Sequence, residues 1–405
     1  MALYQNFPIP SERMGELWTL LPVEGIAILE YGPAGTTHFS IEGFGSLQAR
    51  KGSLLVTTDI DGSDIALGIT KRLENAIDEV VRTHKPKLLF VSASSISSVI
   101  GTDIASILLM MQPDYEETVL IPLTSGGLHD YFSKGIEETL YLLAKHGMEL
   151  EADKEEGDFF NLIGSCADDY NYEADAMELI RTIEGAFGMK AGCIFTSACT
   201  IDGIARMKHA KVNLVIRKEG IRAAEYMKKK YGIPYVYRKP YGKKQTMAWI
   251  QEIADVTGMT YDPEFIVQET KRIEEAMRDS AMRRMMHQKR VLLSGHYDTV
   301  SGIASYFREE GIAAVEVLAC NNPKHATEEV PFTAEKDWLE IVDQFEGDIL
   351  FADAVTLTAR EDKKAIQIAN PNLEHRIYYP YIPFVGFRGG LYLLEQILNL
   401  PISLW

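Results

Sequence analysis

Short apolar runs alternate with helical patterns from one end of the chain to the other. In the first third, the predicted strands are Gly25–Glu30, Leu54–Thr58, Leu88–Val91 and Val119–Pro122. Later runs of the same kind read "FFNLIGS", "AGCIF", "VNLVI", "RVLLSGHYD", "AAVEVLAC", "DILFAD" and "AIQIANP". Apolar strands that alternate with helices are typical of parallel sheets covered on both faces. The sequence therefore predicts three doubly wound α/β domains, one after another.

The domain boundaries follow from the length of the chain and from breaks in this pattern. A chain of 405 residues is too long for one compact core. The acidic stretch Met148–Asp158 is polar and without periodicity, which indicates a linker. A long helix predicted over 263–287 closes the second unit and has a basic face and a Met-rich face. This helix either packs on the unit with one face in solvent or offers a surface on which a partner docks. We expect α/β domains at 1–155, 156–288 and 289–405, the last ending in a C-terminal helix.

One helix of the first domain is predicted in detail. Its buried face is marked by four apolar residues at helical spacing: Ile69, Leu73, Ile77 and Val80. Asp61 or Ser63 precedes them and is suited to cap the first turn. We therefore expect a single helix that begins near Asp61.

Composition narrows the class of partner. The net charge of −17 argues against duplex nucleic acid and against an anionic membrane surface. The N-terminus lacks the basic and apolar regions of a signal peptide, and no apolar stretch is long enough to span a bilayer. These features predict a cytoplasmic protein. Its four cysteines are then expected to be thiols or metal ligands rather than a disulfide framework.

The loops at the predicted strand ends are small, hydroxylated and rich in glycine. They read "GPAGTTH", "SASSISS", "TSGGLHD", "GSCADDYN", "TSACTID", "RKEG" and "SGHYDTVSG". None matches a Walker A loop, a G-x-G-x-x-G fingerprint or a G-x-S-x-G elbow, and the chain has no H-E-x-x-H or C-x-x-C. Ligands of doubly wound folds collect at the carboxyl ends of the strands, so these loops are where chemistry is expected.

The loops and their order carry a resemblance to a known family. The segments are "EYGPAGT", "TTDIDGSDIALGITKRLENAIDEV", "SASSISSVIGTDI", "NLIG", "KVNLVIRKEGIRAAEYMKKKYGIPYV" and the closing "YYPYIPFVGFRGGLYLLEQI". Together they resemble component 1 of nitrogenase and its wider group, which includes the cofactor-assembly scaffold and subunits of the dark-operative protochlorophyllide reductase. The resemblance implies three Rossmann-like domains around a central cleft. It also implies pairing with a homologous subunit, as a homodimer, a heterodimer or an α2β2 assembly, and reduction by an ATP-hydrolysing iron–sulfur partner.

The resemblance also shows which cluster ligands are missing. Where the family has a cysteine after G-P-x-G, this chain has Thr36, and the matching residue of the loop after the third strand is Ser95. A third family cysteine falls near Pro10 by spacing. Iron–sulfur clusters need thiolates, and a neutral hydroxyl is a poor ligand for iron. We therefore expect no ordinary interfacial cluster held by these positions.

Arg217 stands at the position that matches the family's cofactor-binding cysteine. A permanent guanidinium repels a cationic metal and attracts a carboxylate or a phosphate. If Arg217 faces the cleft, the ligand is expected to be a cofactor or an anionic organic or tetrapyrrole-like molecule. The alternative is a structural ion pair.

Three cysteines of the second domain offer a different metal site. Cys166, Cys193 and Cys199 lie at neighbouring strand ends, where they could converge as ligands of a relocated cluster or metal. The alternative is that each is an ordinary core residue, because free cysteine behaves as a small hydrophobe. The cofactor is therefore left open, and an iron–sulfur cluster is expected only at such a non-standard site or through a partner subunit.

Other loop residues are candidates for the cleft. One glycine and four histidines of these loops are candidates: Gly35, His38, His129, His296 and His375. By the resemblance, His375 is the nearest match in sequence to a histidine that ligates the metal cofactor in the family. In "GHYD", Asp298 is placed to orient His296 for acid–base work or metal binding. Ordinary hydrogen bonding is the alternative for each histidine. His325 has no partner that the sequence suggests, and "CADDYNYEAD" (166–175) is interpreted as a solvated loop and a helix N-terminus.

Two functions remain open at this point. The chain is either the cluster-poor subunit of a nitrogenase-like oxidoreductase complex or a non-redox scaffold that keeps the fold and binds a ligand in the cleft. No general acid or base can be assigned, because no paired carboxylates or Ser–His–Asp spacing stand out.

Overall fold

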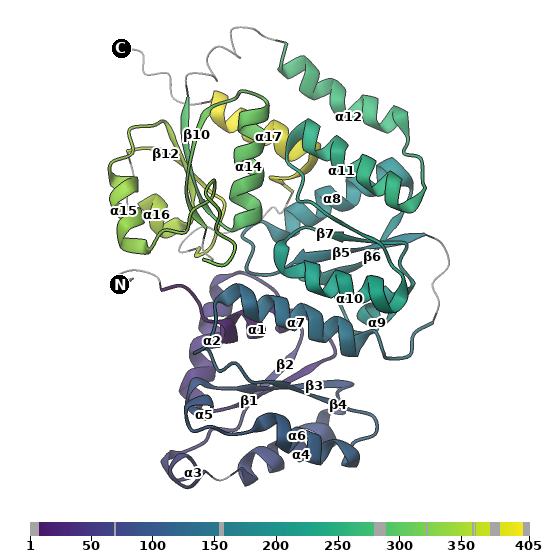
Figure 1. Cartoon of the computed structure of the whole chain (residues 1–405), viewed down its shortest axis with the longest axis vertical. Coiled ribbons are helices and arrows are strands. Elements are labelled where there is room, and N and C mark those ends of the chain that lie inside the picture. Colours follow the sequence, from purple (N-terminus) through teal and green to yellow (C-terminus); the bar gives the residue numbers. More distant parts are fainter. Residues whose placement is uncertain are drawn as a thin grey trace.

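The computed structural model describes residues 8–68, 70–153, 158–278, 289–320, 323–358, 360, 362–372 and 381–399. They form three four-stranded sheets in which every paired strand is parallel. In Figure 1 the first sheet lies at the bottom, the second on the right and the third at the upper left. The predicted α/β fold with parallel sheets is confirmed.

The first sheet has the order β2-β1-β3-β4. Its strands are β1 (Ala27–Tyr31), β2 (Leu54–Thr57), β3 (Leu88–Ala93) and β4 (Val119–Leu123). One face packs against α1 (Glu12–Leu20) and α7 (Phe132–Gly147), and the other against α4 (Lys71–His84) and α6 (Ile104–Met111). The helices α2 (Ala34–Ser46) and α5 (Ser95–Val99) follow β1 and β3 at the carboxyl edge of the sheet.

The helix predicted to begin at Asp61 is broken into two. Asp61 does cap a helix, because its carboxylate accepts hydrogen bonds from the backbone N–H groups of Ser63 and Asp64. That helix, α3 (Gly62–Leu67), ends at Gly68, whose φ of 61° is the left-handed conformation typical of a glycine C-cap. The buried face with Leu73 lies on the separate helix α4. Ile69 lies outside the described residues.

The second sheet has the order β6-β5-β7-β8. Its strands are β5 (Phe159–Ser165), β6 (Lys190–Thr196), β7 (Val212–Val215) and β8 (Tyr235–Tyr237). The helices of this part are α8 (Tyr172–Phe187), α9 (Ile201–Arg206), α10 (Ile221–Tyr231), α11 (Gly242–Thr257) and α12 (Pro263–Ala276). The helix predicted over 263–287 is α12 as far as Ala276, and residues 279–288 lie outside the described part of the chain.

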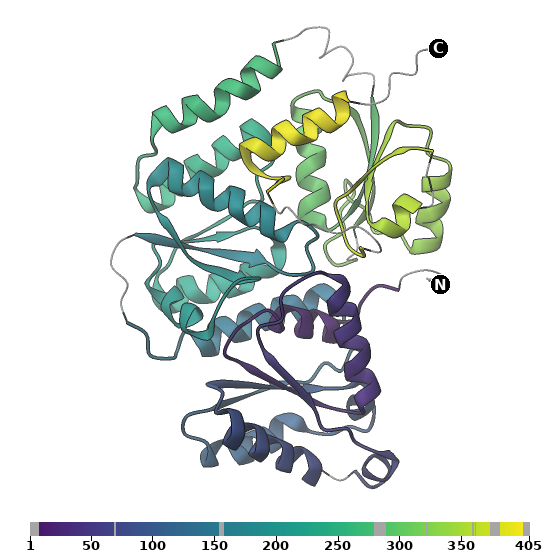
Figure 2. The ribbon, with the colours of Figure 1, turned by 180° about the vertical axis from the view of Figure 1, so that it is seen from behind.

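The third sheet has the order β10-β9-β11-β12. Its strands are β9 (Arg290–Gly295), β10 (Ala314–Cys320), β11 (Ile349–Ala352) and β12 (Lys364–Gln367), with helices α14 (Tyr297–Glu309), α15 (Glu335–Asp343) and α16 (Ala354–Thr358). The last helix, α17 (Gly386–Leu398), follows this sheet in the chain but packs against α8, α11 and α12. Figure 2 shows α17 in yellow across the top of the second unit. This helix ties the second and third units together.

The arrangement of the sheets positions the functional loops. All three sheets have the same strand order: the strand that comes first in the chain lies between the second and the third, and the fourth lies at the edge. The loops at the carboxyl ends of β5, β7, β9 and β11 then meet where the three units come together. No helix among the described residues is long and apolar enough to cross a membrane.

Candidate functional site

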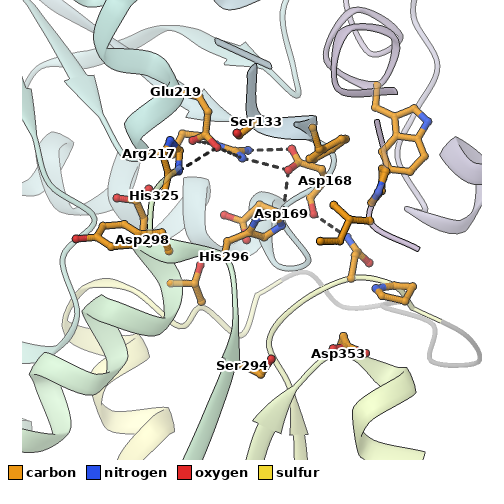
Figure 3. A pocket seen from close by; sticks show the side chains of 18 of the residues that line it. Ser133, Asp168, Asp169, Arg217, Glu219, Ser294, His296, Asp298, His325 and Asp353 are labelled. Carbon is orange, nitrogen blue, oxygen red and sulfur yellow. Dashed lines mark hydrogen bonds and ion pairs between the residues drawn. The ribbon is translucent and has the colours of Figure 1, made fainter. Parts of the chain in front are cut away.

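A cleft lies where the three units meet. Its empty volume is about 1340 Å³, space open to solvent included. The first unit contributes an apolar wall: Ile9, Pro10, Trp18, Leu47 and Phe132. From the second unit come mainly charged residues: Asp168, Asp169, Ile216, Arg217, Glu219 and Lys239. The third unit contributes the largest set, which includes Ser294, His296, Tyr297, Asp298, Thr299, His325, Phe332, Trp338, Asp353, Asn370 and Pro371. Figure 3 shows 18 of the lining residues and labels ten polar ones.

Arg217 is the best-anchored group of the cleft. It follows β7, and its guanidinium lies between Asp168 and Glu219 (Figure 3). Nη1 and Nη2 donate to the two oxygens of Asp168 at 2.9 and 3.2 Å, and Nε donates to Glu219 at 2.9 Å. Gly164 makes room for this side chain, because a Cβ there would lie 2.5 Å from the Arg217 Cγ. The structural ion pair that the sequence left open is therefore present.

The charges of this group hold one another in the ionised state. Burial disfavours ionisation of Glu219, but the adjacent Arg217 overcomes it and lowers the pKa of Glu219 to about 2. Burial likewise opposes the charge on Arg217, but Asp168 and Glu219 raise the pKa of the guanidinium well above its ordinary value. Arg217 and Glu219 are thus both charged throughout the physiological pH range.

A second ion pair lies beside the first. Lys239 donates to Asp169 at 2.6 Å and to the Thr299 hydroxyl at 3.2 Å, and its ammonium lies 3.5 Å from Asp175. Burial opposes ionisation of Asp169, yet Lys239 lowers its pKa, whereas burial raises the pKa of Asp175 to about 6. The interpretation of 166–175 as a solvated acidic loop is therefore wrong. The loop is buried because cations from distant strands neutralise it.

His296 lies in the cleft, but with a different carboxylate from the expected one. Asp298 does not orient His296: it accepts hydrogen bonds from the Tyr237 hydroxyl at 2.5 Å and from the Lys218 backbone N–H at 3.0 Å. The carboxylate next to the imidazole is that of Asp168, 3.7 Å from Nε2. Burial and the nearby Glu219 raise the pKa of Asp298. His296 therefore faces the Arg217 network from the third unit.

Sequence reasoning missed several residues of the lining. His325 packs edge-on against Tyr297, with its Nδ1 3.8 Å from Glu219, and burial lowers its pKa. Asp353 caps α16 through the backbone N–H and hydroxyl of Thr356, and burial raises its pKa. The one usable signal was that Asp353 follows an apolar strand, as ligand-facing loops of this fold class do.

The Thr36 loop is a separate place, outside the lining of the cleft. The Thr36 hydroxyl donates to Glu30 at 2.8 Å, and Glu30 forms a buried ion pair with Arg13 at 2.5 Å. The Ser95 hydroxyl donates to the Gly126 carbonyl at 2.8 Å. Both hydroxyls are engaged within the chain, and neither loop carries a thiol. These residues do not fit an iron–sulfur cluster.

The three cysteines of the second unit are buried in an apolar cluster with Phe195 and Ile201. Burial raises the pKa of Cys166 to about 12, and a hydrogen bond with Cys193, together with burial, raises the pKa of Cys199. Among the described residues, no group of three or more His, Cys, Asp or Glu side chains is arranged to hold a metal ion. This environment favours the alternative interpretation of core residues.

The remaining candidates do not meet in the cleft. Gly35 and His129 are exposed at the first unit, and His38 is 73% exposed beside Glu42 on α2. None of the three lines the cleft. His375 lies outside the described residues, so its expected role stays a prediction.

Comparisons with known proteins identify the family and the fold. Residues 11–401 match the family model described as nitrogenase component 1 type oxidoreductase. The cofactor biosynthesis protein NifE of Clostridium pasteurianum is 28% identical over 347 residues, which cover 83% of this chain and 71% of NifE. One of the subunits of the light-independent protochlorophyllide reductase of Heliobacterium modesticaldum is 20% identical over 91% of this chain and 73% of its own. The fold matches a structure titled "Nitrogenase Cp1 at pH 6.5" with a TM-score of 0.77 and 14% identity, covering 98% of this chain and 94% of that one.

Proposed function

The chain belongs to the nitrogenase component 1 type oxidoreductase family, and on that premise we propose that it is a subunit of a component 1-like complex that binds a ligand in the three-unit cleft. In this proposal the chain holds no interfacial iron–sulfur cluster of its own. Electrons, where they are needed, reach the cleft through clusters of a partner subunit.

One contrast carries the proposal. The cleft is open, its charged groups come from the second and third units, and the first unit contributes mostly apolar side chains. In the Thr36 loop, by contrast, the hydroxyl is bonded to a buried carboxylate of the chain itself. A ligand site has therefore been kept where the family binds its cofactor, while the residues at the cluster loop serve the chain itself.

The shape and charge of the lining support an organic or metallo-organic ligand of tetrapyrrole-like size. Trp18, Phe132 and Trp338 supply flat apolar surface, which suits a planar ring system. Among the described residues of the lining, two are permanent cations, Arg217 and Lys239, and six are carboxylates: Asp168, Asp169, Glu219, Asp298, Glu335 and Asp353. Because Arg217 is already paired, an anionic ligand group is less favoured than the sequence suggested. The polar edge of the proposed ligand is neutral or cationic.

The expected partner is a homologous subunit, with an ATP-hydrolysing iron–sulfur protein as the electron source. In the family the subunit contact lies around the loops 32–40 and 92–98. Several large apolar side chains are exposed on and beside these loops: Phe39 (62%), Val99 (73%), Leu128 (53%) and Tyr131 (42%). An exposed apolar patch of this kind suits a protein interface. A monomer in sedimentation at micromolar concentration, with or without the co-expressed homologue, would count against this pairing.

A second candidate is a scaffold or ligand-binding module without electron transfer. It is favoured by the similarity to NifE, a protein named for cofactor biosynthesis. The hydroxyls at Thr36 and Ser95 favour it as well, because they remove the cluster that would deliver electrons. In both candidates the cleft is the ligand site.

The test is to identify what the cleft holds. The chain is purified without oxygen, and native mass spectrometry measures bound small molecules in the wild type, His296→Ala and His38→Ala. His296 lines the cleft, whereas His38 is a surface histidine and serves as the matched control. We expect a ligand in the wild type and in His38→Ala and reduced occupancy in His296→Ala. No ligand in any sample, or equal retention in all three, would contradict the proposal.

The same samples separate the two candidates. Reduction of the bound ligand on addition of the co-purifying homologue, the ATP-hydrolysing partner and ATP supports the reductase subunit. A ligand that exchanges between proteins and is never reduced supports the scaffold.

A further inference from the structure

Four loops converge at the place that matches the family's cluster. They are the segment before α1, the turn after β1, the start of α5 and the loop after β4. Their contacts are direct: the Ser95 hydroxyl donates to the Gly126 carbonyl, and a Cβ on Gly32 would lie 2.4 Å from the Ser94 side chain. The loops therefore pack on one another, and no bridging group is needed to bring them together.

A buried ion pair lies under these loops. Glu30 is the fourth residue of the otherwise apolar strand "AILEY" and is fully buried, and Arg13 in the first turn of α1 is 4% exposed. One Arg13 Nη reaches Glu30 at 2.5 Å, the Ser40 hydroxyl at 3.1 Å and the Thr36 carbonyl at 3.4 Å. The pair thus joins α1, β1 and α2 at one point.

The residue at position 36 belongs to this network. Its hydroxyl donates to Glu30 at 2.8 Å and lies at the same distance from the Pro33 carbonyl. A cysteine in this position would place its thiol against the Glu30 carboxylate, which is already paired with Arg13, so the site offers a hydrogen-bond acceptor to a neutral S–H and no cation that is free for a thiolate. The surroundings of residue 36 therefore oppose an iron-binding thiolate independently of which residue stands there.

We infer that the Arg13–Glu30 ion pair takes the structural place of the interfacial cluster, so that restoring cysteines at 36 and 95 does not restore iron binding. The pair ties the converging elements by charge, where a cluster would tie them by metal–sulfur bonds. This inference rests on the part of the proposed function that assigns no interfacial cluster to this chain, and it is independent of the ligand in the cleft.

The first test measures iron. The wild type and Thr36→Cys/Ser95→Cys are incubated without oxygen with ferrous iron and sulfide, desalted and analysed for iron and acid-labile sulfide. We expect the two proteins to retain the same background amount. Iron bound only by the double variant would overturn the inference and leave the proposed function standing. Iron and sulfide in the wild type as purified would instead overturn the proposed function.

The second test measures the thiol at position 36. Thr36→Cys is labelled with a maleimide at neutral pH, and His38→Cys, two residues away on the exposed side of α2, is the control. A contact with Glu30 that raises the thiol pKa by one unit makes labelling about tenfold slower. We expect at least this difference, with the buried Cys166 and Cys193 unlabelled as a sign of intact folding.

Equal labelling of the thiols at positions 36 and 38 would contradict the inference, since the side chain at 36 would then not lie on Glu30. Should Thr36→Cys not fold, Glu30→Gln/Arg13→Met removes both charges together and provides the background for the same comparison. In that background the labelling difference between positions 36 and 38 is expected to shrink.

Discussion

Two buried arginines, one at and one beside the positions where the resemblance puts metal ligands, are held differently. Arg217 matches the cofactor-binding cysteine and makes three charge-assisted hydrogen bonds of 3.2 Å or less to Asp168 and Glu219. Arg13 lies beside the Thr36 loop and makes one ion pair, with Glu30. In the part of the chain that the structure describes, Arg13 Nε and Glu30 Oε2 have no hydrogen-bond partner although both are buried.

The two arginines differ in whether a ligand can still bind beside them. Around Arg217 the polar groups are satisfied and stand at the wall of an open cleft, so a ligand can enter without breaking the network. Around Arg13 the chain has filled the space itself, at the cost of some unpaired polar atoms. On our proposals, the first region is the wall of a ligand site, and the second is an ion pair in the place of an interfacial cluster.

The largest expected effect is the loss of Arg217. Arg217→Met leaves Asp168 and Glu219 buried without their cation, which is expected to lower the free energy of unfolding by about 3–5 kcal/mol. Chemical denaturation measures this. Arg290→Met, which removes an exposed pair with Glu316, is the matched control and should cost less than about 1 kcal/mol. Equal losses in the two variants would show that the cleft network is no more structural than a surface ion pair.

Removal of Arg13 should have a smaller effect than removal of Arg217. Arg13→Met leaves one carboxylate unpaired instead of two, and we expect a loss of about 2–3 kcal/mol. Arg13→Met/Glu30→Gln should recover most of it, because both charges leave together. Additive losses in this double-mutant cycle would mean that Arg13 and Glu30 are not coupled.

The two regions should also respond to pH in opposite directions. The pKa of Glu219 is lowered to about 2 from 4.5, so its stabilisation is present above pH 4.5 and is lost as the pH falls toward 2. Burial raises the pKa of Glu16, next to Arg13 on α1, to about 8, so the protonated folded state is favoured at low pH and this stability is lost as the pH rises from 4.5 to 8. At about 1.4 kcal/mol per pKa unit, the shift of Glu219 corresponds to about 3 kcal/mol and that of Glu16 to about 5 kcal/mol.

Denaturation of Glu219→Gln and Glu16→Gln at several pH values separates the two responses. Glu219→Gln should flatten the curve below pH 4.5, and Glu16→Gln should flatten it between pH 4.5 and 8. A wild-type slope that both variants keep would show that neither carboxyl group carries the pH dependence assigned to it.

The smallest expected loss of stability comes from a surface ion pair between the first and third units. Lys324 of the third unit donates to Asp130 of the first at 2.6 Å, with the lysine about half exposed. Lys324→Ala is expected to cost less than about 1 kcal/mol, and less still in high salt. A loss as large as that of Arg13→Met would mean that this contact, rather than the buried pair, holds the first unit in place.

The strands were predictable because apolar runs mark buried parallel strands directly, as in "FFNLIGS" for β5. The helix from Asp61 was misjudged because Gly68 acts as a C-cap, which apolar periodicity does not reveal. The site was harder, since its partners are far apart in sequence. Asp168 and Arg217 are separated by 49 residues, and Asp169 and Lys239 by 70.

The buried acidic loop shows the same limit most clearly. Read alone, Asp168 and Asp169 belong to a polar stretch that water would solvate. Only the sheet order, which places the ends of β5, β7 and β8 side by side, brings Arg217 and Lys239 to them. Glu30 likewise looked like an ordinary strand end, and its cation comes from the first turn of α1.

The measurement that tests the account most directly is iron and acid-labile sulfide in the chain purified without oxygen, alone and together with any co-purifying homologue. We expect no iron or sulfide in the isolated chain, because Arg217 stands at one expected ligand position and the hydroxyl residues Thr36 and Ser95 stand at the other, with iron only where a partner protein supplies it. Iron and sulfide in stoichiometric amounts in the isolated chain would contradict it and would make Cys166, Cys193 and Cys199 the ligands to replace first.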